Sequence, residues 1–471
     1  MTNECKWLVA SESPTAALAR FSHSLDFASL TDREKRAAKR HFLDSLGACV
    51  AGIDQPLVRG AASLLDTLTG GGNVPVAGSG RRTDLLSAVY LMAASCHALE
   101  LDDGNREGSI HPGTVIVPAV LGLGYQLRAS GAAALSAVVA GYEVAVSLAE
   151  VLHPHASRRG FQTTGVVGVV GAAAAAARLL SLDATRVEKA MGIAASSGAG
   201  LFAYLTGGGN IKKLHPAHAA REGVFAALLA ARDVVDGPKA VAETTAGLFH
   251  AFGGIHPWTG AIPGQCPAVL AIARSYTKPY PCCRHIHPAI DGLLSLREKH
   301  RFHADEVASV EIGTYAAAMP HATLGWESLT TAQLSFPFVM AAALRTGTID
   351  LETFSERMRA DPALIADTAK VRVQLDQECC ASYPQQGPAR VAVTLHDGSR
   401  HAIYVADPRG CPELPMSDTE LFEKFRMMAR GRLSPAAVDD IIEHVWTLDT
   451  APSLRPLVDS LSTPFLQKAS A

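Results

Sequence analysis

"LELDDGNREGSIHPGTVIVP", residues 99–118, places a charged loop between two apolar stretches. The segment before it, "DLLSAVYLMAASCHA", and the segment after it, "VIVPAVLGLGYQL", are apolar enough to form buried helices. Charged side chains are costly to bury unless they are paired. Composition leaves two interpretations open: a solvated loop with a capping aspartate, or a polar cluster that lines a cleft between core helices.

The chain around this stretch is predicted to be helical from about residue 14 to residue 274. Apolar residues recur at helical spacing in "DREKRAAKRHFLDSLGACVAG", with Thr31 as its expected N-cap. The glycines and alanines of "GVVGVVGAAAAAA", residues 165–177, predict helices that approach one another closely.

The pattern changes after residue 278. Period-two alternation in "VASVEIGTY", "KVRVQLDQE" and "ARVAVTLHDGSRHAIYVA" predicts strands, with Asp397 and Gly398 at the centre of a hairpin turn. "TTAQLSFPFVMAAALRTG" and "LETFSERMRA" between them have a helical pattern, and helices return from "PMSDTELFEKFRMMAR" onward. We therefore predict a mainly α protein: a large all-helical domain, residues 1–274 completed by 416–471, and a smaller α+β domain, residues 275–415.

Composition excludes several classes of protein. The 471 residues are 48% hydrophobic and carry a net charge of −3 with no basic stripe, so we expect no nucleic-acid partner. Of the two longest apolar stretches, residues 165–177 are too short to cross a bilayer and residues 133–152 contain two glutamates, so we expect no membrane span. No secretory signal opens the chain, and the nine cysteines lack disulfide or zinc spacing, which favours the cytoplasm.

The opening stretch holds the first candidate site. Glu100, Asp102 and Asp103 precede His111 by a short loop. A histidine beside carboxylates in a cleft can act as a general acid or base.

A second candidate is "GGGNIKKLHPAHAAREG", residues 207–223. Lys212 and Lys213 stand just before a strong helix pattern, an arrangement that suits an anionic substrate. The alternative is two surface lysines ahead of a capped helix. The spacing does not match a phosphate-binding loop.

A third candidate is "TKPYPCCRHIHPAIDGLL", residues 277–294, at the junction of the two predicted domains, where clefts often form. It contains Lys278, Cys283, Arg284, His285 and His287. A cysteine–histidine nucleophile and a histidine metal site are the alternatives here, but no metal-ligand spacing is present. The inventory as a whole indicates cofactor-free proton chemistry on a small carboxylate.

Four blocks carry a resemblance to a known family: "HALELDDGNREGSIHPG", "KKLHPAHAAREGVFAALLA", "KPYPCCRHIHPAID" and "DPRGCPELPMSDTELFEKF". They resemble the MmgE/PrpD family, which includes 2-methylcitrate dehydratases, cis-aconitate decarboxylases and an iminodisuccinate epimerase. The likeness covers nearly the whole chain. It implies an α+β lid domain over the helical domain, an active site between them, and a homodimer without metal or organic cofactor.

The resemblance also implies roles for single residues. His111 resembles the family's catalytic histidine, Lys212 the lysine ahead of the "LHP" motif, and Lys278 the lysine that enters the lid. Tyr315 lies where decarboxylases have an active-site tyrosine.

The chain departs from the family at three positions. Glu100 stands where many members have the first aspartate of an Asp-x-Asp-Asp run. Gln162 and Cys283 stand where cis-aconitate decarboxylases carry histidines, which disfavours a strict cis-aconitate decarboxylase. Gln162 and Thr163 in "RRGFQTTGVVG" on their own indicate only a helix N-terminus.

We therefore expect a cofactor-independent, dehydratase-like lyase that removes a proton α to a carboxylate of a small di- or tricarboxylate. The alternatives are an epimerase, isomerase or decarboxylase that uses the same proton abstraction, and a non-catalytic dimer. The expected catalytic residues are His111, Glu100, Asp102, Lys212 and Tyr315, the expected substrate contacts are Asp103, Gln162, Thr163, Lys278, Cys283 and His287, and no metal ligands are expected.

Overall fold

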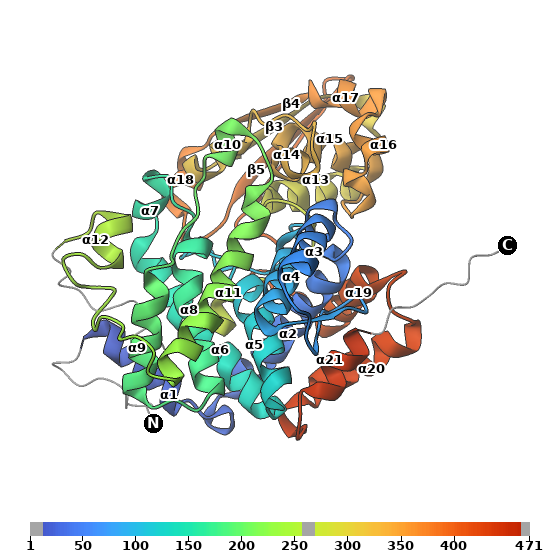
Figure 1. Ribbon diagram of the computed structural model, residues 1–471. Helices are drawn as coiled ribbons and strands as arrows, with labels where there is room; N and C mark the ends of the chain where they lie inside the picture. Colours follow the sequence, from blue (N-terminus) through green and yellow to red (C-terminus); the bar gives the residue numbers. More distant parts are fainter. Residues whose placement is uncertain (1–12, 257–268, 463–471) are drawn as a thin grey trace.

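The computed structural model describes residues 13–256 and 269–462, and it has two hydrophobic cores (Figure 1). The mainly α fold class is confirmed. The N-terminal residues on which the expectation of no secretory signal rests lie outside the described residues.

Helices build the larger core, which holds residues from Leu18 to Ala273 and from Leu421 to Leu461. The helices of this part are α1 (Pro14–Ser24), α2 (Asp32–Gly52), α3 (Pro56–Leu68), α4 (Leu85–His97), α5 (Gly113–Leu127), α6 (Gly131–Leu152), α7 (His155–Arg158), α8 (Thr163–Leu179), α9 (Ala184–Ala195), α10 (Tyr204–Gly207), α11 (His215–Ala231), α12 (Leu248–Gly253), α19 (Asp418–Ala429), α20 (Pro435–Trp446) and α21 (Arg455–Leu461).

Local signals set where these helices begin. Thr31 caps α2 as predicted, because its hydroxyl accepts from the backbone N–H of Glu34 while the Glu34 carboxylate accepts from the backbone N–H of Thr31. Asp183 and Ser417 cap α9 and α19 through their side chains in a similar way.

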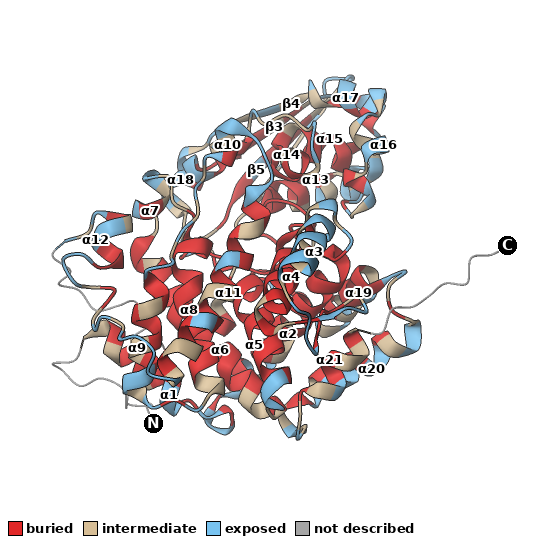
Figure 2. Ribbon diagram, in the orientation of Figure 1, coloured by how far each residue is buried: buried red, intermediate tan, exposed pale blue. Residues whose placement is uncertain are grey.

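Small residues let the central helices approach closely, as the sequence predicted. A Cβ on Gly223 of α11 would lie 2.5 Å from the Cβ of Ala172 in α8. A Cβ on Gly171 of α8 would lie 2.8 Å from the carbonyl oxygen of Gly141 in α6. Figure 2 shows that α5, α6 and α8 are buried over most of their length. Among the described residues, α6 is the one helix long and apolar enough to cross a membrane, and it packs inside this bundle.

The helical part is not purely helical, so the expectation of an all-helical domain was wrong in this detail. A two-stranded antiparallel ribbon joins β1 (Val74–Pro75) to β2 (Arg82–Thr83). Strands of two residues are too short to produce a period-two pattern in the sequence.

The smaller core belongs to a four-stranded sheet and its helices, and it runs mainly from Tyr280 to Val393. The strands are β3 (Val307–Thr314), β4 (Val371–Leu375), β5 (Ala389–Leu395) and β6 (Arg400–Val405), in the order β4-β3-β5-β6 with only the β3–β4 pair parallel. The helices are α13 (His287–His300), α14 (Leu329–Leu334), α15 (Phe336–Thr346), α16 (Glu356–Arg359), α17 (Pro362–Thr368) and α18 (Gln377–Ser382).

Two details of this part bear on the sequence predictions. Gly398 has φ +88° in the turn between β5 and β6, where the hairpin was predicted. The segment "LETFSERMRA" is not one helix, because Ser355 caps a new short helix, α16, after a separate 3-10 turn.

The last helices pack against the first part of the chain. Helix α19 lies along α2, and α21 contacts α5 (Figure 1). A buried ion pair joins Lys424 of α19 to Asp44 of α2, with 2.6 Å between Nζ and Oδ1. The division of the chain near residues 274 and 415 stays a proposal, and the membership of the two cores is consistent with it.

Candidate active site

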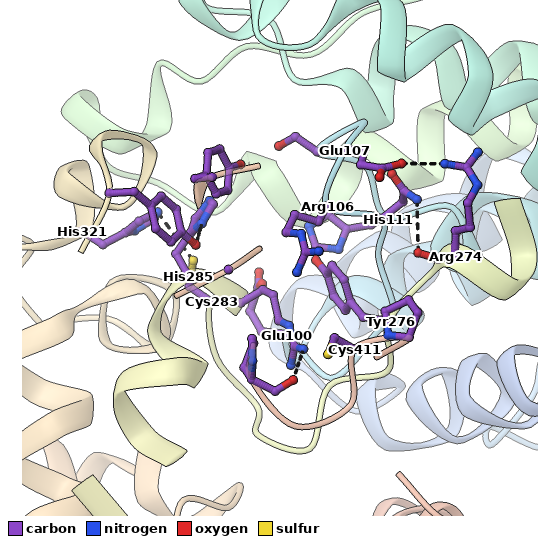
Figure 3. A pocket seen from close by; sticks show the side chains of 18 of the residues that line it. Glu100, Arg106, Glu107, His111, Arg274, Tyr276, Cys283, His285, His321 and Cys411 are labelled. Atoms are coloured by element: carbon purple, nitrogen blue, oxygen red, sulfur yellow. Dashed lines mark hydrogen bonds and ion pairs between the residues drawn. The ribbon is translucent and has the colours of Figure 1, made fainter. Parts of the chain in front are cut away.

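A cavity of about 280 Å³ is lined by residues of both parts of the chain. The lining includes Glu100, Arg106, His111, Gln162, Tyr204, Lys212, Arg274, Tyr276, Cys283, Arg284, His285, Tyr315, His321 and Tyr383. The loop between α4 and α5, which contains the opening stretch of the sequence, contributes Glu100, Arg106, Glu107 and His111 to this lining (Figure 3). The interpretation of that stretch as a solvated loop is therefore wrong.

Glu100 is surrounded by ammonium groups. Its Oε1 accepts from Lys212 and, at 2.8 Å, from Lys213, and its Oε2 lies 3.3 Å from Nζ of Lys278. Burial alone would raise the pKa of Glu100, but the three lysines outweigh it and hold the pKa well below its usual range. The cluster therefore keeps a charged carboxylate and three cations together in a buried place.

The lysines come from two short segments. Lys212 and Lys213 lie on a 3-10 turn, Ile211–Leu214, directly before α11, so they are not the surface pair of the alternative interpretation. Lys212 lines the cavity. Burial lowers the pKa of Lys213 to about 8, although Glu100 opposes the shift. Lys213 lies in the second candidate stretch but was not among the expected site residues.

Asp102 joins two histidines. Its Oδ2 lies 3.1 Å from Nδ1 of His97 and 2.8 Å from Nδ1 of His111. His111 Nδ1 also lies 2.9 Å from the carbonyl oxygen of Asp103, which can only accept. Nδ1 of His111 therefore carries the hydrogen, and in the neutral ring Nε2 is the unprotonated nitrogen.

His97 connects Asp102 and His111 to the lysines around Glu100. Its Nε2 lies 2.9 Å from Nζ of Lys212, so it accepts from the ammonium group while Nδ1 donates to Asp102. Burial, reinforced by the charge of Lys212, lowers the pKa of His97 to about 3. His97 was not predicted as a site residue, although a histidine at the end of an otherwise apolar helix could have indicated one.

Asp103 does not line the cavity, although we had expected it to contact the substrate. Its Oδ1 accepts from the backbone N–H of Gly113 at 2.9 Å, and its Oδ2 accepts from the Tyr142 hydroxyl at 2.6 Å. It also lies 3.1 Å from Nδ1 of His41. Asp103 therefore anchors the start of α5 in the helical core.

The segment that begins α8 positions the His111 loop. The hydroxyl of Thr164 accepts from the backbone N–H of His111 at 3.1 Å, and Thr163 donates to the carbonyl oxygen of Ser109. Gln162 lines the cavity and pairs with His215. Thr163 is buried and anchors the loop. It is not among the described residues that line the cavity.

Lys278 and His287 also lie behind the cavity wall. Lys278 is fully buried and contacts Glu100 and, at 3.9 Å, Asp102. His287 donates from Nε2 to the carbonyl oxygen of Cys282 at 3.3 Å and accepts at Nδ1 from Arg284. These contacts correct the expectation that both side chains touch substrate: Lys278 acts on Glu100, and His287 holds its own segment.

The other wall of the cavity comes from the smaller core. The Cys283 sulfur lies 3.5 Å from Nε2 of His321, and Nδ1 of His285 lies 2.8 Å from the Tyr315 hydroxyl. Tyr315 stacks on Tyr383 with 4.1 Å between ring centroids. His321 and Tyr383 were missed, because no sequence spacing links them to Cys283 or Tyr315.

Arginines add positive charge to the lining. Arg106 pairs with Asp407 at 2.7 Å, and Arg274 pairs with Glu107 and Glu150 at 2.5 Å each. Nε of Arg106, and Nε and one terminal nitrogen of Arg274, have no hydrogen-bond partner among the residues that the structure describes. Buried donors without partners suit an anionic ligand.

Three groups of described residues bring possible metal-ligand atoms within 4.8 Å of one another: Cys283, His285 and His321; His97, Asp102 and His111; Asp407, Cys411 and Glu413. The first group joins two segments of the chain, and the other two each lie within one short stretch whose spacing matches no common metal motif. The expectation of no metal ligands stays a prediction.

Fold and site together define a class: a mainly helical protein with a second α+β core, and a cationic cavity that presents a histidine base held by a carboxylate. The chain belongs to the MmgE/PrpD family, whose N-terminal domain model matches residues 16–260 and whose C-terminal domain model matches residues 280–448.

Individual relatives are similar over nearly the whole chain. A cis-aconitate decarboxylase-like protein of Aspergillus oryzae is 27% identical over 456 residues, 90% of this chain and 92% of that protein. A cis-aconitate decarboxylase of Aspergillus terreus is 25% identical over 91% of each chain. The Homo sapiens cis-aconitate decarboxylase is 26% identical over 96% of this chain and 95% of its own.

Proposed function

We propose that the protein is a cofactor-independent lyase that transfers a proton at the carbon next to a carboxylate of a small di- or tricarboxylate. The observation that carries the proposal is the hydrogen bonding of His111. Both partners of its Nδ1 are acceptors, so Nε2 is the basic nitrogen of a side chain that lines a cationic cavity.

The charges around the cavity match such a step. When Nε2 of His111 takes a proton from carbon, the imidazolium that forms is stabilised by Asp102. Negative charge then develops on the enolate-like carboxylate, and Lys212 is the cation on the cavity wall that lies closest to the histidine pair, through His97.

Dehydration is the first candidate reaction. A hydroxyl on the neighbouring carbon leaves after or with the proton, and the leaving group needs an acid. We assign that role to Tyr315, because Tyr315 lines the cavity and its hydroxyl is hydrogen-bonded to His285. The resulting product is an unsaturated carboxylate and water.

Decarboxylation is the second candidate, and the names of the relatives favour it. In that reaction carbon dioxide leaves first, and protonated His111 returns a proton to the carbanion. The neutral side chain of Gln162 opposes it, since that position lacks the ionisable histidine that the decarboxylases carry. Epimerisation would use the same proton transfer without a leaving group, and a non-catalytic dimer would use none of it.

Product analysis separates these candidates. Purified protein is incubated with citrate-like and unsaturated di- and tricarboxylates, and products are followed by NMR together with released carbon dioxide. Water loss or addition without carbon dioxide supports the dehydratase. Release of stoichiometric carbon dioxide indicates a decarboxylase instead of a dehydratase. Inversion of configuration without loss of water or carbon dioxide indicates the epimerase. No reaction with any member of the panel contradicts the lyase.

A further inference from the structure

Cys283 and His321 form a pair on the cavity wall opposite the His111 loop. The sulfur and Nε2 are 3.5 Å apart, and both side chains line the cavity (Figure 3). The other ring nitrogen of His321, Nδ1, is buried and has no hydrogen-bond partner among the described residues. The proposed proton transfer at His111 does not use this pair.

The surroundings of Cys283 set it apart from the other described cysteines. Burial would raise the pKa of its thiol, but the charge and hydrogen bond of His321 outweigh burial and lower it, against a smaller opposing effect of Glu100. The pKa of His321 is raised, because the Cys283 charge outweighs burial. Burial raises the pKa of Cys282 well above its usual value and that of Cys411 to about 11.

We propose that Cys283 and His321 are a thiolate–imidazolium pair that adds covalently to the electron-poor double bond of an unsaturated di- or tricarboxylate held in the cavity. The sulfur bonds to the β-carbon, and the π electrons move to the α-carbon. The proton on Nε2 of His321 then passes to the α-carbon. The acid is added whole, nothing leaves, and both partners end neutral as a thioether and an imidazole.

The positive charge of the lining favours an anionic electrophile, as it favours an anionic substrate. Lys212, Arg106 and Arg284 share the lining with Cys283, so a carboxylate next to the double bond is held beside the sulfur. The supply of such an acid rests on the proposed function, because dehydration produces a double bond next to a carboxylate. An adduct at Cys283 occupies the cavity that the substrate must enter, and it therefore makes the product a slow covalent inhibitor.

The experiment measures alkylation of each cysteine by peptide mass spectrometry. Full-length protein is treated with iodoacetamide from pH 5 to pH 10, and separately with maleate or with neutral acrylamide. Cys380, which is exposed, is the internal reference, and Cys282→Ser is the matched control beside the reactive position. Peptide mapping of the wild type does not depend on whether Cys283→Ser folds.

We expect Cys283 to react with iodoacetamide about tenfold faster than Cys380 at pH 7, with a midpoint below about 8.5. His321→Gln should move that midpoint to about 8.5 or above, because the positive partner is lost. Maleate should add one molecule at Cys283 with a rate that saturates, and succinate should slow it. Acrylamide should show no saturation, and Cys282→Ser should behave as the wild type.

Three outcomes overturn the proposal. Cys283 that titrates as an ordinary thiol overturns the ion pair. Alkylation by iodoacetamide without a maleate adduct overturns the addition step. Alkylation that begins only after a chelator is added shows that Cys283, His285 and His321 hold a metal instead. A maleate adduct in a protein with no turnover contradicts the lyase and leaves the thiolate pair in place.

Discussion

At the scale of single residues, Glu100 shows how the site holds its charge. The carboxylate is buried, and it stays ionised because Lys212, Lys213 and Lys278 surround it. A buried charge is tolerated when it is paired and hydrogen-bonded. The excess of positive charge then faces the cavity, where an anionic substrate completes the balance.

Lys213 makes substrate affinity depend on pH. Its pKa is lowered to about 8 by burial, so it is charged at neutral pH and loses its proton as pH rises through about 8. The cavity then becomes less positive, and we expect KM for an anionic substrate to rise by about tenfold above this pH.

The test compares Lys213→Met with the wild type by steady-state kinetics from pH 6 to pH 9.5. The variant should have a raised KM at pH 7 and should lack the rise around pH 8. Lys189→Met is the control, because Lys189 lies on α9 and pairs with Asp233 at the surface. An unchanged pH profile of KM in Lys213→Met would contradict this role.

Sequence alone located the loop and its working residues, but not their directions. Glu100, Asp102 and His111 were predicted from charge next to apolar helices; Glu100 and His111 line the cavity, and Asp102 is buried behind His111. Asp103 is one residue further and turns into the core to bind Tyr142. Such a reversal depends on backbone geometry that residue types do not show.

At the scale of elements, two segments far from the acidic loop in the sequence hold it in place. Thr164 of α8 holds the backbone of His111, and Lys424 of α19 donates to the carbonyl oxygen of Leu101 at 2.7 Å. The loop is therefore fixed both from α8 and from α19, near the end of the chain. Helix periods and caps predicted these elements, but not that α19 reaches the loop.

Lys424 links stability to the site. Lys424→Met removes a buried ammonium group, leaves Asp44 unpaired and releases Leu101. We expect the free energy of unfolding to fall by about 3–5 kcal/mol, as measured by denaturant unfolding. Arg426→Ala on the same helix breaks only the exposed pair with Asp439 and should cost less than about 1 kcal/mol. Equal losses in the two variants would refute the account.

Glu143 in the middle of α6 makes stability depend on pH. Its carboxylate accepts from the backbone N–H of Ala271 at 2.7 Å, and burial raises its pKa to about 7. The folded protein therefore holds this proton more tightly than the unfolded chain, and stability falls as pH rises from about 4.5 to about 7.

Glu143→Gln keeps the acceptor and removes the titration. The variant should be more stable than the wild type by about 2–3 kcal/mol at pH 8 and equally stable at pH 4.5, as measured by denaturant unfolding at both values. A difference that does not change with pH would show that the carboxyl group is not the cause.

At the scale of the whole molecule, the cavity exists because two hydrophobic cores meet over one loop. Period-two and helical patterns predicted both cores, since each core has many members in regular elements. The ribbon of β1 and β2 escaped prediction because it is too short. His321 escaped because the folding of the smaller part, and no sequence spacing, brings it to Cys283. Arg106 escaped because its partner, Asp407, lies in the other part of the chain.

We also propose that the protein is a homodimer in the cytoplasm. The family favours a dimer, whereas the small-residue helices are buried inside this chain. Light scattering at micromolar concentration should give about twice the chain mass of 49.4 kDa. A monomer at all concentrations up to this range would refute the proposal.

The central claim is that His111 moves a proton at the carbon next to a carboxylate. NMR of saturated and unsaturated di- and tricarboxylates incubated with the protein in deuterated water tests it. Decarboxylation and epimerisation place solvent deuterium on that carbon, and a dehydratase does so when it runs in reverse and hydrates the unsaturated acid. We predict deuterium incorporation by the wild type and a loss of about 10²–10⁴ in its rate for His111→Asn, with an unchanged thermal midpoint. Incorporation by His111→Asn at the wild-type rate would contradict the account.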